Sequence, residues 1–246
     1  MINKNLQQIF YDKFYESESY ENSSEKMKEP FINRFLDMVL ESEEKDVIEI
    51  GCGDGKITRY LLKRNLKVCG VDISPVAIKK MKAQFKDYTK NGQLVVECDD
   101  IINYLKKSEK KSDVIIGGGI IHHIKKDEWS SLFTSAFNRL KKGGVFACAP
   151  EPNAGGAYFY TWAFLAKFVH KLFKMDYDTE VEKGTLDMKP NFIIKALKSS
   201  GFSEVEIKPY QVIPHFNSKF ISLIDKRLVN FFKGRLSLYM IIKAKK

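Results

Sequence analysis

Short apolar segments alternate with amphipathic helical patterns through the middle of the chain, and this alternation limits the possible folds more than any other feature. Five segments rich in Val and Ile are predicted strands: 46–50, 66–71, 94–97, 113–116 and 144–148. Strands of this composition are typical of parallel sheets, which the connecting helices cover on both faces. The sequence therefore predicts an α/β fold.

Helix boundaries are marked most clearly at two places. Ser74 followed by Pro75 is a typical helix start, because serine caps the first turn and proline fits the first helical position. A second helix is predicted from Trp129 to Leu140, where apolar residues recur every three or four positions. We expect Lys141–Gly143 to end it.

Residues 151–188 interrupt the alternation with many aromatic residues and glycines, and we interpret them as an insertion at the substrate side of the sheet. A helix over 190–200 and strands over 204–209 and 236–243 are predicted to follow. The aromatic and histidine side chains of the insertion are candidates for the wall of an apolar pocket or for helix core: Tyr158, Tyr160, Trp162 and His170.

A glycine-rich turn follows the first predicted strand, at Glu49-Ile50-Gly51-Cys52-Gly53-Asp54-Gly55. Glycine lacks the Cβ atom that would keep a ligand away from the backbone, and it tolerates dihedral angles that other residues avoid. The second strand ends at Asp72, about 20 residues further on, where a carboxylate can accept hydrogen bonds from ribose hydroxyls. Together these features predict a cofactor that carries adenosine.

The spacing of the glycines separates two classes of adenosine-binding enzyme. Nicotinamide-dependent enzymes use G-x-G-x-x-G, whereas this chain has G-x-G-x-G, with Lys56 at the position of the last glycine of the dinucleotide pattern. Here the chain resembles the class I S-adenosylmethionine (SAM) dependent methyltransferases. The segments that carry the resemblance are Glu49–Gly55, Asp72–Pro75, Cys98–Ile101, Leu140–Gly144 and, more loosely, Ala196–Phe202.

The resemblance implies a Rossmann-like three-layer sandwich with an inserted cap. Its seven-stranded, mostly parallel sheet would have the strand order 3-2-1-4-5-7-6. It also implies a single domain made of a helical lid at 1–40, a SAM-binding core at 41–150, the insertion at 151–188 and a C-terminal completion of the sheet at 189–246.

The family's roles, carried over to matching positions, imply a set of cofactor contacts. The glycine turn, with Gly51, Cys52, Gly53 and Gly55 after Glu49, would hold the methionine and ribose parts, and Gly117 would line the methionine part. Asp72 would bind the ribose, while Ile73, Asp99, Asp100 and Ile101 would surround the adenine. Alternatives stay open, since Asp99 and Asp100 could cap the next helix and Cys52 could be a buried filler.

Two adjacent histidines, His122 and His123, follow the fourth predicted strand. A neutral imidazole can take a proton from a hydroxyl acceptor near pH 7, so His122 is the candidate catalytic base. His123 is a second candidate, with a packing role as its alternative. Glu151 and Asn153 follow the fifth strand, where they could orient a substrate hydroxyl or form a turn.

The N-terminal segment Phe10–Tyr15 resembles the aromatic lid helix of small-molecule methyltransferases, which implies that Tyr11 closes over the cofactor. A basic amphipathic segment at 217–233 is compatible with peripheral membrane contact, and a helix packed on the sheet is the alternative.

The net charge is +10, but the lysines are dispersed as pairs near helix ends, which favours solvated faces over a nucleic-acid surface. The four cysteines show no metal-binding spacing, and no segment has the roughly 20 apolar residues of a membrane span. We therefore expect a cytoplasmic protein without a metal site.

The sequence thus predicts an enzyme that moves a methyl group from SAM, leaving S-adenosylhomocysteine, to a small-molecule acceptor such as a hydroxylated metabolite, a saccharide, or a lipid or quinone precursor. A nicotinamide-dependent oxidoreductase and a SAM-binding scaffold without catalysis are the alternatives. The residues alone fix neither the acceptor nor the oligomeric state.

Overall fold

The structure is a computed structural model that describes residues 4–16, 29–40, 45–107, 109–157, 181–211, 219–232 and 235–246. The chain forms two compact units. The first contains residues 1–118, 131–147 and 245–246, and the second contains residues 119–130 and 148–244.

Seven strands form one sheet in the order β3-β2-β1-β4-β5-β7-β6, as predicted. Their bounds are β1 Asp46–Ile50, β2 Lys67–Asp72, β3 Leu94–Cys98, β4 Ser112–Gly117, β5 Leu140–Pro152, β6 Glu204–Tyr210 and β7 Tyr239–Lys245. β1 pairs in parallel with β2 and β4, and β2 pairs in parallel with β3. The carboxyl ends of these four strands therefore meet at one edge of the sheet.

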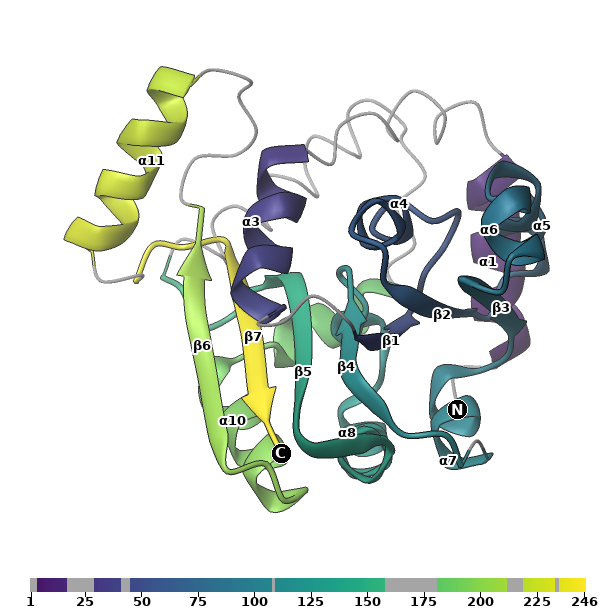
Figure 1. The fold of residues 1–246 in the computed structure, drawn as a ribbon. Helices are drawn as coiled ribbons and strands as arrows, with labels where there is room; N and C mark the ends of the chain where they lie inside the picture. Colours follow the sequence, from purple (N-terminus) through teal and green to yellow (C-terminus); the bar gives the residue numbers. More distant parts are fainter. Residues whose placement is uncertain are drawn as a thin grey trace. The chain divides into compact units, whose positions relative to one another are not determined.

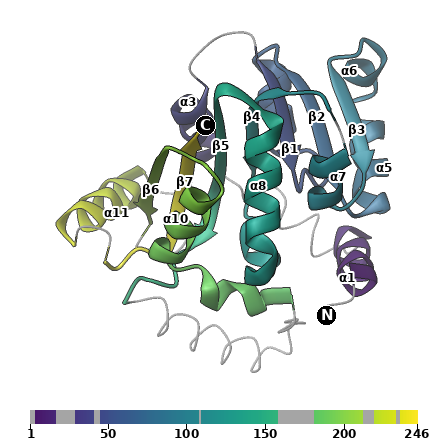
Figure 2. The same ribbon diagram turned by 90° about the horizontal axis from the view of Figure 1, so that it is seen from below.

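Helices cover both faces of the sheet in the first unit (Figures 1 and 2). α4 (Thr58–Lys63) and α5 (Pro75–Gln84) pack on one face, and α7 (Ile101–Lys107) and α8 (Trp129–Arg139) lie on the other. α1 (Lys4–Glu16) contacts α5, and α3 (Glu29–Val39) and α6 (Lys86–Lys90) complete the unit. α5 starts as predicted, since the Ser74 hydroxyl accepts a hydrogen bond from the Ala77 N–H at 3.1 Å.

Among its described residues, the second unit contains short helical turns and two further helices. Its elements beside β6 and most of β7 are η1 (Ile121–His123), η2 (Lys126–Glu128), η3 (Val181–Asp187), α10 (Pro190–Ser199) and α11 (Lys219–Phe231). α10 and β6 confirm the predicted helix and strand after the insertion.

The predicted end of the helix that starts at Trp129 was wrong. α8 ends at Arg139, and the segment Lys141–Gly143 belongs to β5, which runs from Leu140 instead of from residue 144. The amide of Gly143 donates to the Lys246 carbonyl at 3.2 Å, and the Lys246 amide donates to the Gly144 carbonyl at 2.9 Å. Pairing with the end of the chain, which no local pattern reveals, extends the strand.

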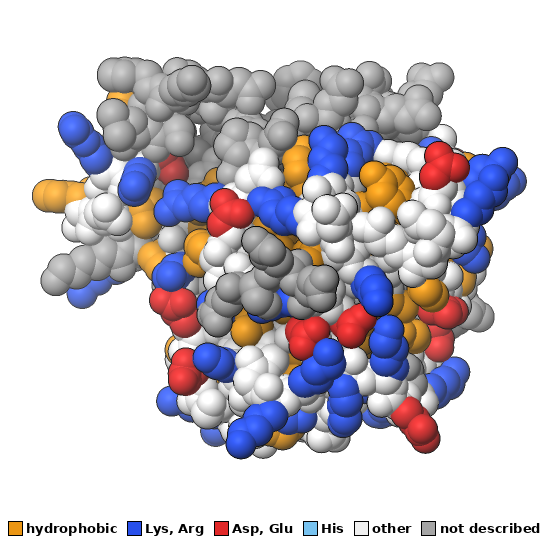
Figure 3. Space-filling model, viewed as in Figure 1, with side chains coloured by type: hydrophobic (Ala, Val, Ile, Leu, Met, Phe, Trp, Pro, Cys, Tyr) orange, Lys and Arg blue, Asp and Glu red, His pale blue; other side chains and the backbone are white. Residues whose placement is uncertain are grey.

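The aromatic residues of the insertion named above, from Tyr158 to His170, lie outside the described residues. The division into lid, core, insertion and C-terminal completion stays a prediction. On the face shown in Figure 3, Lys and Arg side chains are scattered among acidic and other side chains. Among the described residues, no helix has both the length and the apolar character required to cross a bilayer.

Candidate cofactor and catalytic sites

The glycine turn lies directly after β1 and is tied to β2. The amides of Gly51 and Cys52 both donate to the Val71 carbonyl, at 2.8 and 3.1 Å. Gly53 and Gly55 have φ angles of +55° and +93°, in the region that favours glycine. A Cβ at Gly55 would clash with the ring of Phe85, so close packing also requires this glycine.

Asp72 joins the glycine turn to the next helix. One carboxylate oxygen, Oδ2, accepts from the Gly53 amide at 2.8 Å, and the other, Oδ1, accepts from the Ser74 amide at 2.9 Å. Burial raises the pKa of this carboxyl, and the hydrogen bonds from Ser74 and Gly53 oppose that rise. The two segments on which the cofactor hypothesis depends are therefore in direct contact.

The end of β3 lies beside Asp72 as well, because the Asp99 amide donates to the Asp72 carbonyl at 3.1 Å. Asp100 caps α7, since its Oδ1 accepts from the Asn103 amide at 3.0 Å. This confirms the capping alternative for Asp100, whereas the Asp99 carboxylate pairs with Lys107 at 3.4 Å. Gly117 pairs in register with Ile50, at the start of the glycine turn.

Glu49 is buried, and its carboxylate accepts a hydrogen bond from the Thr58 hydroxyl. Burial raises the pKa of Glu49 from its ordinary 4.5 to about 8, and the neighbouring carboxylates of Asp72 and Asp54 add to the rise. Cys52 is buried too, and burial raises the pKa of its thiol. A thiol in this environment acts as a small filler, in agreement with the alternative for its side chain.

The N-terminal helix α1 is attached to the same part of the first unit. The Asp12 carboxylate accepts from the Ser74 hydroxyl at 2.5 Å and from the Val76 amide at 3.4 Å, at the start of α5. Lys80 of α5 donates to the Tyr15 carbonyl at 2.6 Å. A Cβ at Gly53 would clash with the Tyr15 hydroxyl, so Tyr15 lies against the glycine turn.

The sequence hypothesis missed Tyr15 and Asp12 and named Tyr11 instead. Tyr11 packs edge to face against Phe10, with ring centroids 5.3 Å apart, and its contact with a cofactor stays a prediction. The recurring aromatic residues of the segment predict a lid helix but do not show which of them faces the turn.

In the second unit, Glu151 holds His122. The carboxylate of Glu151 is fully buried, and its Oε1 accepts from the Ile120 and Ile121 amides, both at 2.8 Å. Its Oε2 lies 2.8 Å from Nδ1 of His122. With Glu151 ionised, Nδ1 carries the proton and donates, which leaves Nε2 of His122 as a proton acceptor.

The sequence placed Glu151 and Asn153 together near a substrate, but the structure separates their roles. Glu151 orients a histidine, a role that the sequence did not suggest for it. Asn153 donates to the Ser237 hydroxyl at 2.7 Å and accepts from the Gly155 amide at 3.1 Å, which confirms the turn alternative. The ring of His123 lies next to that of His122, with centroids 3.8 Å apart and a tilt of 44° between the ring planes.

The described residues contain no group of three or more His, Cys, Asp or Glu side chains that could hold a metal ion.

Comparison with known proteins identifies the domain. A sequence profile described as a methyltransferase domain matches residues 48–146. The malonyl-[acyl-carrier protein] O-methyltransferase 1 of Ilyobacter polytropus is 31% identical over 56% of this chain and 52% of its own length, so the chain spans about half of that relative. A ubiquinone biosynthesis O-methyltransferase of Coxiella burnetii is 24% identical, over 71% of this chain and 70% of its own.

Solved structures agree in fold. A SAM-dependent methyltransferase from Archaeoglobus fulgidus superposes with a TM-score of 0.59 at 17% identity, covering 97% of this chain and 98% of its own. Phosphoethanolamine N-methyltransferase 2 of Haemonchus contortus, in complex with SAM, gives a TM-score of 0.66 at 16% identity, covering 96% of this chain and 60% of its own. The profile match therefore identifies residues 48–146 as a methyltransferase domain, and the strand order of the sheet agrees with the fold of these SAM-dependent methyltransferases.

Proposed function

We propose that this protein transfers a methyl group from SAM to a small-molecule acceptor. The observation that carries the proposal is the hydrogen bond from the Gly53 amide to the Asp72 carboxylate. This bond holds the glycine backbone of the turn next to a buried carboxylate. Each Asp72 oxygen accepts one backbone amide and keeps a lone pair for a ribose hydroxyl.

The remaining cofactor contacts follow from the same edge of the sheet. Ile73, Asp99, Asp100 and Ile101 follow β2 and β3 and would surround the adenine, while Gly51, Cys52, Gly53 and Gly117 would line the methionine part. Glu49, Gly55 and Tyr11 complete the proposed set, and Tyr15 joins it because it lies against Gly53. Bound SAM would supply the electrophilic methyl group on its sulfonium, so the protein's task is to align a nucleophile.

We assign the base role to His122, with Glu151 as the positioning residue. Glu151 accepts from Nδ1, so Nε2 of His122 would take the proton of an acceptor hydroxyl that is aligned with the methyl group of bound SAM. The imidazolium then returns the proton to solvent. His123 remains the second candidate for the base.

The presence of a base favours an oxygen acceptor over a nitrogen acceptor. A hydroxyl must lose its proton during the transfer, whereas a neutral amine already has a lone pair for the attack. Both curated relatives named above are O-methyltransferases. The acceptor class therefore comprises hydroxylated metabolites, saccharides and lipid or quinone precursors. We expect no nucleic-acid substrate.

A peripheral membrane contact through α11 is part of the proposal. Phe231 is 79% exposed at the end of this helix, and Lys226 and Arg227 are exposed on it. Apolar and basic side chains on one helix suit the surface of an anionic bilayer. Cosedimentation with vesicles that contain phosphatidylglycerol should be lost in Phe231→Ser, and equal sedimentation of this variant would contradict the contact.

A cytoplasmic location completes the proposal. It is supported by the free thiols of all four cysteines, each of which lies among the described residues.

Turnover and calorimetry test the proposed activity. Release of S-adenosylhomocysteine should appear with at least one member of a panel of hydroxylated metabolites and quinols. Binding of SAM without turnover on any acceptor would favour the scaffold alternative. Tight binding of NAD with no response to SAM would favour the oxidoreductase.

A further inference from the structure

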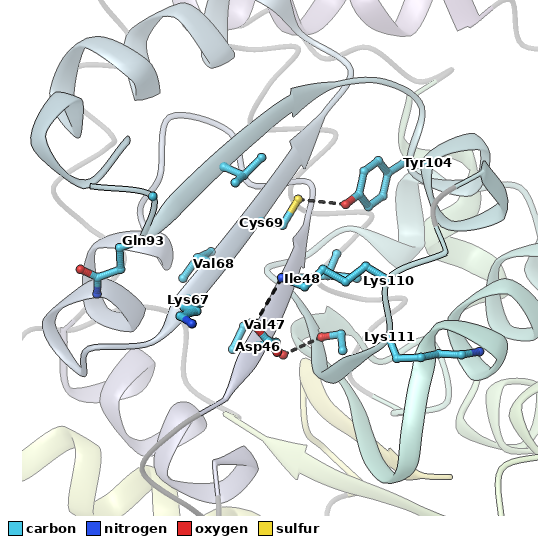
Figure 4. A pocket seen from close by; sticks show the side chains of 13 residues that line it. Asp46, Val47, Ile48, Lys67, Val68, Cys69, Gln93, Tyr104, Lys110 and Lys111 are labelled. Atoms are coloured by element: carbon cyan, nitrogen blue, oxygen red, sulfur yellow. Dashed lines mark hydrogen bonds and ion pairs between the residues drawn. The ribbon is translucent and has the colours of Figure 1, made fainter. Parts of the chain in front are cut away.

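A small pocket lies at the end of the sheet opposite the glycine turn, and the proposed function does not use it. Asp46, Lys67 and Ser112, the first residues of β1, β2 and β4, line it, as do Cys69 and Tyr104 (Figure 4). The glycine turn follows the last residue of β1, so β1 separates the two sites. The pocket volume is about 70 Å³, enough for one small ion.

The polar groups of the pocket include two lysines with different orientations. Lys110 extends across the pocket, and its ammonium lies 3.5 Å from Asp46 (Figure 4). Lys111 points away from the pocket, and its ammonium binds the Asn138 carbonyl. Also in the pocket wall, the Cys69 sulfur lies 3.0 Å from the Tyr104 hydroxyl (Figure 4).

Arg139, the last residue of α8, directly follows Asn138, whose carbonyl binds the ammonium of the pocket residue Lys111. Its positive charge and that of Lys110 both act to lower the pKa of Cys69, and the Tyr104 hydroxyl is among the groups that affect the pKa of Arg139. Cys69 and Tyr104, two side chains that interact electrostatically with Arg139, both line the pocket.

The guanidinium of Arg139 lacks expected hydrogen bonds. The residue is only 4% exposed, and neither Nε nor Nη2 has a hydrogen-bond partner among the residues that the structure describes. A buried charged donor without an acceptor is destabilising, because the water it lost has not been replaced. Nε and Nη2 lie on the same edge of the guanidinium, which matches two oxygens of one carboxylate or phosphate.

We propose that Arg139 and this pocket form a binding site for a small oxyanion, a carboxylate or a phosphate group. Nε and Nη2 are shielded from solvent, so binding includes a rotation of the Arg139 side chain that turns this edge into the pocket. Lys110 adds a second positive charge. The site is separate from the proposed cofactor site within the first unit.

Thermal unfolding of the full chain in inorganic phosphate or acetate, against chloride at equal ionic strength, tests the proposal without relying on methyl transfer. An anion that binds only the folded state stabilises it by mass action, so phosphate at about four times its Kd should raise the Tm by about 2–4 °C. The two anions distinguish a phosphate site from a carboxylate site. The Tm response should saturate.

Three variants complete the test. Arg139→Met should abolish the response and, in chloride, should melt higher than wild type, because it removes the unsatisfied donors. Arg139→Lys keeps the charge without the paired donors, so its Tm should respond only weakly. This variant also tests the proposal if Arg139→Met does not fold. Arg34→Met, at an exposed arginine of α3, is the matched control and should respond as wild type does.

Two outcomes would overturn the proposal. No difference between chloride and either oxyanion would mean that water or local rearrangement satisfies Arg139. An unchanged response in Arg139→Met and Arg139→Lys would mean that phosphate acts elsewhere, as an adventitious ion only.

Discussion

Replacing Glu151 with glutamine removes one charge from the proposed catalytic pair while preserving the shape of the side chain. The amide oxygen of glutamine can still accept from the Ile120 and Ile121 amides, which lie 2.8 Å from the carboxylate. The amide nitrogen must then face Nδ1 of His122, the atom now 2.8 Å from Oε2. Because that nitrogen is a donor, Nδ1 must become an acceptor, and the proton moves to Nε2.

A histidine with its proton on Nε2 cannot take a proton from a hydroxyl. General-base catalysis contributes about 10²–10⁴ in rate, so kcat of Glu151→Gln should fall by about that factor at neutral pH. SAM affinity should stay within about twofold, because Glu151 belongs to the second unit and the proposed cofactor residues belong to the first. Loss of charge in the buried hydrogen bonds should cost about 1–2 kcal/mol of unfolding free energy.

The assay combines release of S-adenosylhomocysteine, SAM titration by calorimetry and thermal unfolding. His122→Gln should match Glu151→Gln in kcat, and the double variant should lose no more than either alone, because the two side chains act together. Asp127→Asn, an exposed neighbour on η2, is the control and should turn over normally. A folded Glu151→Gln protein with full turnover would refute the pair, and a parallel loss of SAM affinity would assign Glu151 a structural role.

Three further predictions concern the first unit. Asp72→Ala should weaken SAM binding at least 100-fold in calorimetry, because it removes the proposed ribose acceptor together with the contact that holds the turn. Glu49→Gln should remove a pH dependence of stability. The folded pKa of Glu49 is raised to about 8, so the free energy of unfolding of wild type should fall as pH rises from about 4.5 to 8. Denaturant titrations should show a fall on the order of 5 kcal/mol for wild type and no such fall for the variant. Asp12→Ala should release SAM about 2- to 10-fold faster in stopped-flow measurements, since it frees α1 and Tyr15 from the Ser74 hydroxyl.

Each of these predictions has its own control. Asp37→Ala, at an exposed carboxylate of α3 that pairs with Arg64, should leave SAM affinity unchanged. Equal weakening by both changes would argue against a ribose role for Asp72. A Glu49→Gln protein that keeps the wild-type pH profile would place the titration elsewhere. Lys13→Ala, next to Asp12 in sequence, should leave the SAM release rate unchanged, and an unchanged rate in Asp12→Ala would show that α1 does not retain the cofactor.

The sequence predicted those parts of the fold that depend on neighbouring residues. The start of α5 at Ser74 and Pro75, the glycine turn after β1 and the strand order all follow from local patterns or from family resemblance. The start of β5 at Leu140 depends on pairing with Lys246, more than 100 positions away, and therefore could not be predicted.

The candidate sites show the same division. Asp72 was predicted from its place at a strand end, but its hydrogen bond to Gly53 needed the folded chain. The pairing of His122 with Glu151 joins residues 29 positions apart, and residue type alone left Glu151 with several possible partners. Tyr15 could not be distinguished from Tyr11, because both are tyrosines of one helix and only its rotation decides which one meets the turn.

The double use of the Asp72 carboxylate has a consequence for how quickly a nucleoside can be captured. Since the protein's own side chain already fixes the loop that a ligand would otherwise have to organise, little chain entropy remains to be lost on arrival. Affinity then derives from the contacts themselves. Because exchange of spent for fresh cofactor needs no refolding of the loop, the segment that covers the site from outside determines the rate of exchange.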